Sequence, residues 1–241
     1  MKSLFRAVSI AALLLASGCA LSHKRPPFPD PDRLVSVVKV SPAGERPILK
    51  QDLLTLRSES KTLAPIAGYV FRKGSLHVGS TPELIQFAMV SMDFFPALGV
   101  KPALGRALQS EENQSGRDHI AVISYNLWQR RFGGDPNLIG RAITLDHDRY
   151  TVVGVMPADF QVPKECELWT PLAFDIECFN LEAKCPEVEV IARLKPGVTL
   201  DEAQAEVSVI TRKLEGDPPE NDAGRDIKLT ALRESISQKE K

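Results

Sequence analysis

The sequence predicts an α+β fold in which strand–helix units from both ends of the chain form one discontinuous domain, with a segment of different character inserted between them. Strand and helix patterns follow each other after Leu34 and again after Pro186. Between these units, residues 65–90 and 141–155 alternate apolar and polar residues as antiparallel strands do. The 241 residues are 43% hydrophobic and 25% charged, which is ordinary for a folded globule.

The first unit begins at Leu34. Residues 34–40, LVSVVKV, are short and β-branched, so we expect a strand. In residues 47–60 leucines recur at helical spacing, which predicts a helix. We expect residues 65–90 to form an antiparallel meander of several short pieces. Ser91 is expected to cap a short helix in residues 92–98, MDFFPAL, which Gly99 can end in the left-handed region.

The middle segment combines one helix with a hairpin. The polar residues 111–118, EENQSGRD, predict a surface loop, and residues 119–124, HIAVIS, predict a buried strand. Ser124 can cap the following helix, which two glycines, Gly133 and Gly134, terminate. Residues 141–145 and 149–155 then form the arms of a hairpin.

The C-terminal unit reads as strand, turn, helix and strand. Residues 187–194, EVEVIARL, predict the first strand, and Thr199 and Glu202 stand at the spacing of a capping box. A final strand is expected in residues 226–232. Four apolar residues give the helix one buried face: Ala203, Val207, Ile210 and Leu214.

The N-terminus has the pattern of a secretory signal. Lys2 and Arg6 precede an apolar run in residues 7–16, which is shorter than the roughly 18 residues that a membrane-spanning helix needs. Small residues then lead into Cys19, and the whole segment resembles a bacterial lipoprotein signal. The resemblance implies that residues 1–18 are removed and that the Cys19 thiol carries a lipid. The alternatives are an ordinary secreted protein cut nearby and an uncleaved signal anchor.

The residues after the signal predict an extended tether. Residues 19–33 are rich in proline and show no apolar periodicity, so we expect them to link a lipid to a fold that starts at residue 34. Ala20 follows Cys19 where the lipoprotein resemblance would require an aspartate for retention in the inner membrane. Ala20 therefore favours sorting to the outer membrane if the envelope has two membranes, and it says nothing about which membrane face the chain uses. We separately expect the chain on the periplasmic side of the cell envelope.

The net charge gives no indication of a nucleic-acid partner. The formal charge is −1, and it becomes −3 when Lys2 and Arg6 leave with the signal.

The cysteines that follow the signal suggest one disulfide. Cys178 and Cys185 close the shortest loop among the remaining cysteines and are the candidate disulfide in an oxidising compartment, which leaves Cys166 free. A zinc site is the alternative, but the cysteine spacing matches no common ligand set and no histidine lies near.

The sequence contains no recognisable catalytic or cofactor motif. A nucleophile elbow, a zinc-protease helix, a phosphate-binding loop and a dinucleotide fingerprint are all absent, so we expect no enzyme activity, no cofactor and no bound nucleotide. The acidic residues Glu111, Glu112 and the triplet 146–148, DHD, are interpreted as turns and not as cation sites. The four histidines, His23, His77, His119 and His147, are spaced too widely for a cluster and are interpreted as solvated surface residues. The aromatic residues Trp128, Phe132 and Trp169 are interpreted as core residues and not as a binding face.

Four stretches carry a family resemblance: VSMDFFPALGVKPALGRAL, IAVISYNLWQRRFGGDPNLIGRAITLDHDRYTVVGVMPADF, ELWTPLA and VIARLKPGVTLDEAQAE. They resemble the periplasmic core domain of MacB-like ABC transporter permeases over residues 25–236. In that family the domain follows a first transmembrane helix, whereas this chain carries a lipoprotein-like signal in that place. The resemblance implies a porter-like part formed by residues 34–105 and 186–236, with an inserted α+β subdomain in residues 106–185.

The resemblance also implies a function without catalysis. Such domains act by contact with a periplasmic adaptor protein, with the permease or with released substrate. We therefore expect a lipid-anchored binding module of an export system. Two alternatives stay open, namely a decayed permease remnant and a secreted binding protein without a role in transport.

Overall fold

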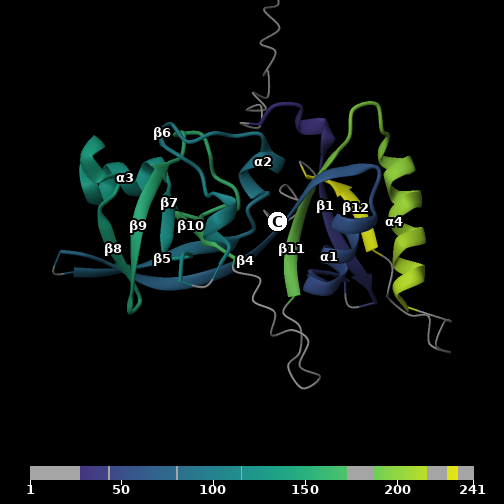
Figure 1. The fold of residues 1–241 in the computed structure, drawn as a ribbon, viewed down its shortest axis with the longest axis horizontal. Helices are drawn as coiled ribbons and strands as arrows, with labels where there is room; N and C mark the ends of the chain where they lie inside the picture. Colours follow the sequence, from purple (N-terminus) through teal and green to yellow (C-terminus); the bar gives the residue numbers. More distant parts are fainter. Residues whose placement is uncertain are drawn as a thin grey trace, which may run out of the picture.

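The computed structural model describes residues 28–42, 44–79, 81–114, 116–172, 187–215 and 227–232. In these residues a long mixed sheet carries helices on its faces, in agreement with the predicted α+β class (Figure 1). The helices are η1 (Pro31–Arg33), α1 (Lys50–Glu59), α2 (Phe94–Leu98), η2 (Ser110–Glu112), α3 (Tyr125–Phe132), η3 (Pro136–Leu138) and α4 (Leu200–Glu215). The strands are β1 (Leu34–Ser41), β2 (Gly44–Arg46), β3 (Ile48–Leu49), β4 (Leu63–Val78), β5 (Thr81–Val90), β6 (Leu104–Gly105), β7 (Ile120–Ile123), β8 (Ala142–Leu145), β9 (Asp148–Val155), β10 (Leu168–Pro171), β11 (Glu187–Leu194) and β12 (Ile227–Ala231).

The strands follow the order β12-β1-β11-β4-β5-β10-β7-β9-β6. Strands from the two ends of the described chain lie side by side, because β1 pairs antiparallel with both β11 and β12. The pairs β5–β10 and β7–β9 are parallel. The first strand–helix unit and the last one therefore build a single layer, as the sequence predicted.

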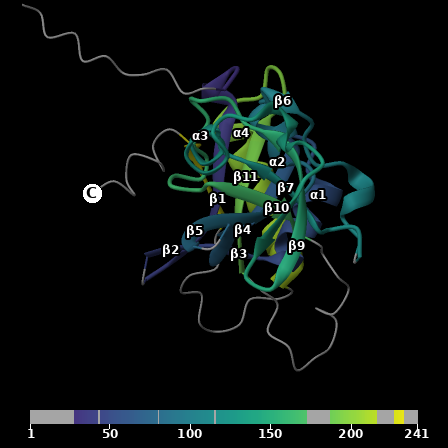
Figure 2. The ribbon, with the colours of Figure 1, turned by 90° about the vertical axis from the view of Figure 1, so that its left-hand side faces the viewer.

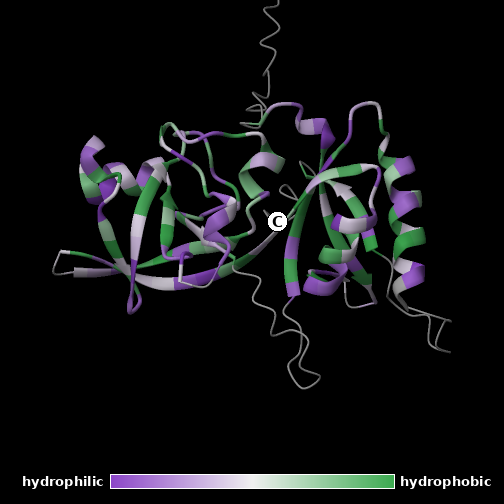
Figure 3. Ribbon diagram, viewed as in Figure 1, coloured by the Kyte–Doolittle hydropathy of each residue, from purple (hydrophilic) through white to green (hydrophobic). Residues whose placement is uncertain are grey.

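Helices α1 and α4 cover one face of this layer. Figure 3 shows the strands beside them largely in the hydrophobic colour, while α4 alternates between hydrophobic and hydrophilic residues. The predicted stripe on α4 is buried at Ala203, Val207 and Ile210, and the side chain of Leu214 lies outside the described residues. These side chains pack with Leu53 and Leu56 of α1 in one apolar cluster.

Strands β4 and β5 connect the two halves of the molecule. They pair antiparallel along their lengths, from Tyr69 opposite Val90 to Val78 opposite Thr81. The prediction of several short pieces in residues 65–90 was therefore wrong, because two long strands occupy this range. Interruptions such as Gly74 do not end β4, since its neighbours on β5 continue the ladder.

The second half of the molecule carries α3, β7, β8 and β9, and Figure 2 views the molecule from this end. The predicted hairpin is present, with β8 and β9 paired from Leu145 opposite Asp148 to Ala142 opposite Thr151. Ile143 and Leu145 are both buried in the apolar cluster of this half. The boundaries predicted for an inserted subdomain, residues 106–185, stay a prediction.

An aromatic core lies between the two halves. Phe95 of α2 contacts Phe94, Phe160 and Trp169, with ring centroids 5.4–6.1 Å apart. Tyr69 of β4 extends the chain of contacts through Phe94 at 5.6 Å. Edge-to-face pairs of this kind add to the free energy gained by burial, so this cluster holds α2 against both halves.

Three of the predicted helix-capping residues act as caps, and one does not. The Ser124 Oγ accepts a hydrogen bond from Leu127 N at 3.1 Å, and Gly133 and Gly99 end their helices in the left-handed region. Ser91, however, does not cap α2 through its side chain. Its hydroxyl instead accepts a hydrogen bond from the buried Gly68 N–H at 3.1 Å.

None of the described helices is long and apolar enough to cross a membrane.

Candidate functional site

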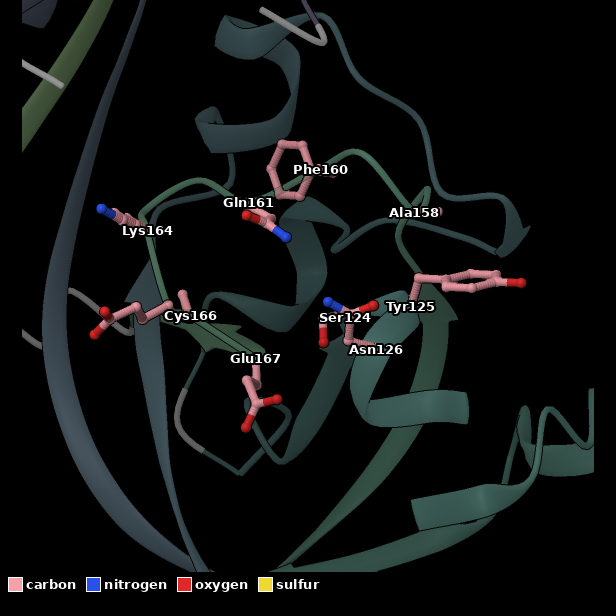
Figure 4. A pocket seen from close by; sticks show the side chains of 10 residues that line it. Ser124, Tyr125, Asn126, Ala158, Phe160, Gln161, Lys164, Cys166 and Glu167 are labelled. Carbon is pink, nitrogen blue, oxygen red and sulfur yellow. The ribbon is translucent and has the colours of Figure 1, made fainter. Parts of the chain in front are cut away.

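The first cavity lies where α3 begins, and it has a volume of about 330 Å³. Figure 4 shows Ser124 and Asn126 at the start of α3, with Lys164 and Tyr125 on opposite sides of the space. Phe160 and Cys166 complete the lining together with the loop that precedes β10. None of the described histidines lines this cavity, and the Ser124 hydroxyl accepts a hydrogen bond from Leu127 N at 3.1 Å.

Three polar groups at this cavity have partners among the described residues. Ser124 N donates to the Glu167 carbonyl oxygen at 2.8 Å, and the Glu167 carboxylate pairs with Arg130 at 2.8 Å. The Glu165 carboxylate accepts a hydrogen bond from Gln86 Nε2 at 2.7 Å. These bonds join the start of α3, the loop before β10 and strand β5.

Cys166 lies at the wall of this cavity but is buried, with 4% of its surface exposed. It is free, as the sequence predicted, and its Sγ–H donates to the Leu168 carbonyl oxygen at 3.2 Å. Burial raises the pKa of this thiol to about 12. The thiol therefore stays protonated at neutral pH and acts as a small core residue.

A second cavity of about 380 Å³ lies at the tip of the β4–β5 ribbon. Arg131 donates to the carbonyl oxygens of Val78 and Thr81, both at 2.9 Å, and pairs with Glu83 at 3.3 Å. Arg141, which also lines the cavity, pairs with Asp135 at 3.2 Å. Arg131 therefore holds the turn between β4 and β5 in place, and each of the two arginines is paired with a carboxylate.

The segment that enters β1 lies against the folded body. We call residues 28–33 the strap. Phe28 is 8% exposed and belongs to the same apolar cluster as Phe94 and Leu98 of α2. Pro29 lies against Gly99, where an added Cβ would come within 2.6 Å of the proline Cγ. Residues 28–33 were predicted to belong to an extended tether, and that prediction was wrong because this part rests on the folded body.

Two arginines bind the strap to β11. The Arg33 guanidinium donates to the Leu194 carbonyl oxygen at 2.6 and 2.9 Å. Arg193 is 9% exposed, and it donates to the Ala97 carbonyl oxygen at 2.8 Å and to the Asp30 carbonyl oxygen at 3.3 Å. One buried guanidinium therefore joins β11, the end of α2 and the strap.

The predicted site residues lie partly outside the described chain. Cys19, Cys178, Cys185 and His23 all fall outside it, so lipidation and the disulfide stay predictions. His77, His119 and His147 are exposed, as expected. No group of three or more described His, Cys, Asp or Glu side chains could hold a metal ion.

Residues 146–148, DHD, lie at the turn between β8 and β9, as interpreted from the sequence. Asp146 has a positive φ of 55°, and its carboxylate accepts a hydrogen bond from Ser75 N at 2.7 Å, which fixes the hairpin tip to β4. Glu112 departs from the expected surface loop, since it is 9% exposed and pairs with Arg106 at 2.6 Å. A carboxylate can be buried there because it also accepts a hydrogen bond from Gln109 N.

The aromatic residues follow the core prediction in different degrees. Trp169 is completely buried, while Trp128 and Phe132 are half-buried against the cluster of the second half. Sequence reasoning missed the strap, although Phe28 was a signal. It is the one aromatic residue among the prolines and charged residues of positions 19–33.

One sequence profile and several solved structures match this chain. Residues 7–210 match the sequence profile described as the MacB-like periplasmic core domain. The periplasmic region of MacB from Actinobacillus actinomycetemcomitans is similar in structure, with 14% identity, a TM-score of 0.64, and 86% of this chain and 92% of that chain covered. No curated protein matches the chain in sequence.

Two further solved structures have the same fold. A domain of a permease protein from Porphyromonas gingivalis has 15% identity and a TM-score of 0.61, with 85% of this chain and 92% of that chain covered. The extracellular domain of the ABC-type transporter YknZ from Gram-positive bacteria has 11% identity and a TM-score of 0.59, with 82% of this chain and 99% of that one covered. The profile match spans most of the sequence, and the chain therefore belongs to the family of MacB-like periplasmic core domains.

Proposed function

We propose that this chain is a non-enzymatic, lipid-anchored contact module on the periplasmic side of the cell envelope, acting in an export system of the MacB type. The observation that carries the proposal is the family match over residues 7–210, together with a fold shared with extracytoplasmic domains of transporters.

The anchor is the first part of the proposal. Cys19 would carry the lipid after removal of residues 1–18, and Ala20 favours the outer membrane in an envelope with two membranes. The family match begins at residue 7, inside the apolar run, so an uncleaved anchor is the competing arrangement. Intact-mass measurement on the native chain and on Cys19→Ser separates the two, because only lipidation gives a mass that Cys19→Ser abolishes.

The partner is the second part. We propose that the chain contacts a periplasmic adaptor protein or a MacB-like permease and itself binds no nucleotide, cofactor or nucleic acid. The test is cross-linking in cells followed by purification under denaturing conditions, with Cys19→Ser as the unanchored control. Recovery of an adaptor or permease that depends on Cys19 supports the proposal.

Two results favour the alternatives. A chain that folds and is lipidated but recovers no transporter component, and whose deletion leaves export intact, is a remnant of a permease. A chain released without lipid that binds a ligand independently of any transporter is a secreted binding protein.

A further inference from the structure

We propose that the strap fixes the exit point of the N-terminal chain, so that the lipid anchor holds one defined edge of the body toward the membrane that carries the lipid. The edge consists of the strap, the C-terminal end of α2 and the turn between β11 and α4, which lie together along the upper side of Figure 1. This proposal rests on the lipidation of Cys19 proposed above.

The contacts of the strap differ from those of a flexible linker. Phe28 is buried in the apolar cluster that includes α2, Arg193 of β11 donates to the strap, and Arg33 of the strap donates to β11. A pull on the residues before Phe28 must therefore first expose an aromatic ring and break bonds to a buried guanidinium. Such contacts keep the exit point fixed relative to α2.

The two ends of the described chain meet at this edge. Val35 stands opposite Ala231 in the β1–β12 ladder, and Leu232 belongs to the same apolar cluster as Phe28. Strand β1 runs away from the edge for eight residues, which places Val40 roughly 20 Å from Leu34. The body therefore has a near end and a far end relative to the anchor.

The strap also shortens the tether. Residues 20–27 separate Cys19 from Phe28, and a fully extended chain of that length spans about 30 Å. A free tether through Arg33 would span about 50 Å. The strap edge therefore stays within about 30 Å of the lipid headgroups. A component of the export system that meets the strap edge must therefore come within about 30 Å of this membrane.

The test uses the full lipidated chain in nanodiscs, with methyl labels on valine and lipids that carry a gadolinium chelate on the headgroup. Val100 follows α2 and Val198 lies in the β11–α4 turn, so both report on the strap edge, while Val40 reports on the far end of β1. We expect strong broadening of the Val100 and Val198 signals and little broadening of Val40. Equal broadening of the three overturns the proposal.

Variants test the effect of the strap separately from the effect of the lipid anchor. Phe28→Ser should release the strap and reduce the contrast between the two ends at least twofold, whereas Leu54→Ser, a change at an exposed side chain of α1, should leave it unchanged. If Phe28→Ser does not fold, eight Gly and Ser residues inserted before Phe28 lengthen the tether, and they should weaken the broadening at Val100. Unchanged broadening in Phe28→Ser or in the insertion variant overturns the proposal. A wild-type chain without lipid contradicts the proposed anchor, while a lipidated chain without contrast contradicts the strap alone.

Discussion

The contact between α4 and the start of β4 allows a quantitative prediction for Glu206. Its carboxylate accepts hydrogen bonds from Lys61 N at 2.8 Å, from Ser60 Oγ at 2.8 Å, from Thr62 N at 3.0 Å and from the Thr62 hydroxyl. The change Glu206→Gln preserves the shape of the side chain but turns an NH₂ group toward one of these donors. We expect it to destabilise the fold without altering the backbone.

The magnitude follows from the donors that lose a charged acceptor. Hydrogen bonds to a charged group contribute about 1.5–3 kcal/mol, and Gln keeps one acceptor oxygen, so we expect a loss of about 2 kcal/mol. For a chain of this size that corresponds to a fall of roughly 4–8 °C in Tm. The exposed pair of Lys213 with Glu59, 3.7 Å apart, offers the control, since Glu59→Gln should cost less than about 0.5 kcal/mol.

The pH dependence gives the second half of this prediction. Burial raises the pKa of the Glu206 carboxyl, but the hydrogen bonds from Thr62, Lys61 and Ser60 outweigh it and hold the pKa below its ordinary value. A lowered pKa in the folded state stabilises the fold above the unfolded pKa of about 4.3, and this stabilisation is lost as the pH falls through the folded pKa.

Urea unfolding at pH 7 and near pH 3 measures both effects. The difference between wild type and Glu206→Gln should be largest at pH 7 and shrink in acid, where the wild-type side chain becomes neutral as well. A difference below about 0.5 kcal/mol at pH 7, or one that does not change with pH, would refute this account of the α4–β4 contact.

Three further predictions test the packing. Gly154→Ala would place a Cβ 2.2 Å from the Arg106 carbonyl oxygen, so we expect it to separate β6 from β9 and to destabilise the fold by roughly 1–3 kcal/mol. Gly74→Ala should destabilise it less, because the added Cβ there meets only side chains, the nearest at 3.0 Å. Calorimetry compares the two variants, and equal Tm values would contradict the prediction. Cys166 should resist maleimide in the native chain and react in denaturant, as read by peptide mapping; native labelling would contradict its burial. Gln204→Ala removes the side chain that accepts from Leu229 N at 2.8 Å on the outer edge of β12, so hydrogen exchange at that amide should accelerate at least tenfold, and unchanged protection would count against this role.

Features set by neighbouring residues were predictable from the sequence. Ser124 caps α3 because its side chain reaches an amide three residues ahead, and Thr199 and Glu202 bond to each other in the same way. The hairpin of β8 and β9 and the buried stripe on α4 likewise depend on local periodicity. These elements required no knowledge of their distant partners.

Features set by distant partners were not predictable in the same way. Ser91 looked like a cap, yet its hydroxyl serves Gly68, 23 residues earlier in the chain. Glu112 looked like a solvated residue until its partner Arg106 was located beside it. The strap was missed because its contacts to Arg193 join residues 163 positions apart.

The most direct test of the central claim is quantitative cross-linking mass spectrometry on native membranes, with Lys101 and Lys195 near the strap edge as reactive groups. The account predicts a mature chain that starts at lipidated Cys19 and cross-links through these lysines to a transporter adaptor or permease. A chain that is lipidated but forms no such cross-link while a transporter of this type is present would contradict the claim that it works as a membrane-held contact module.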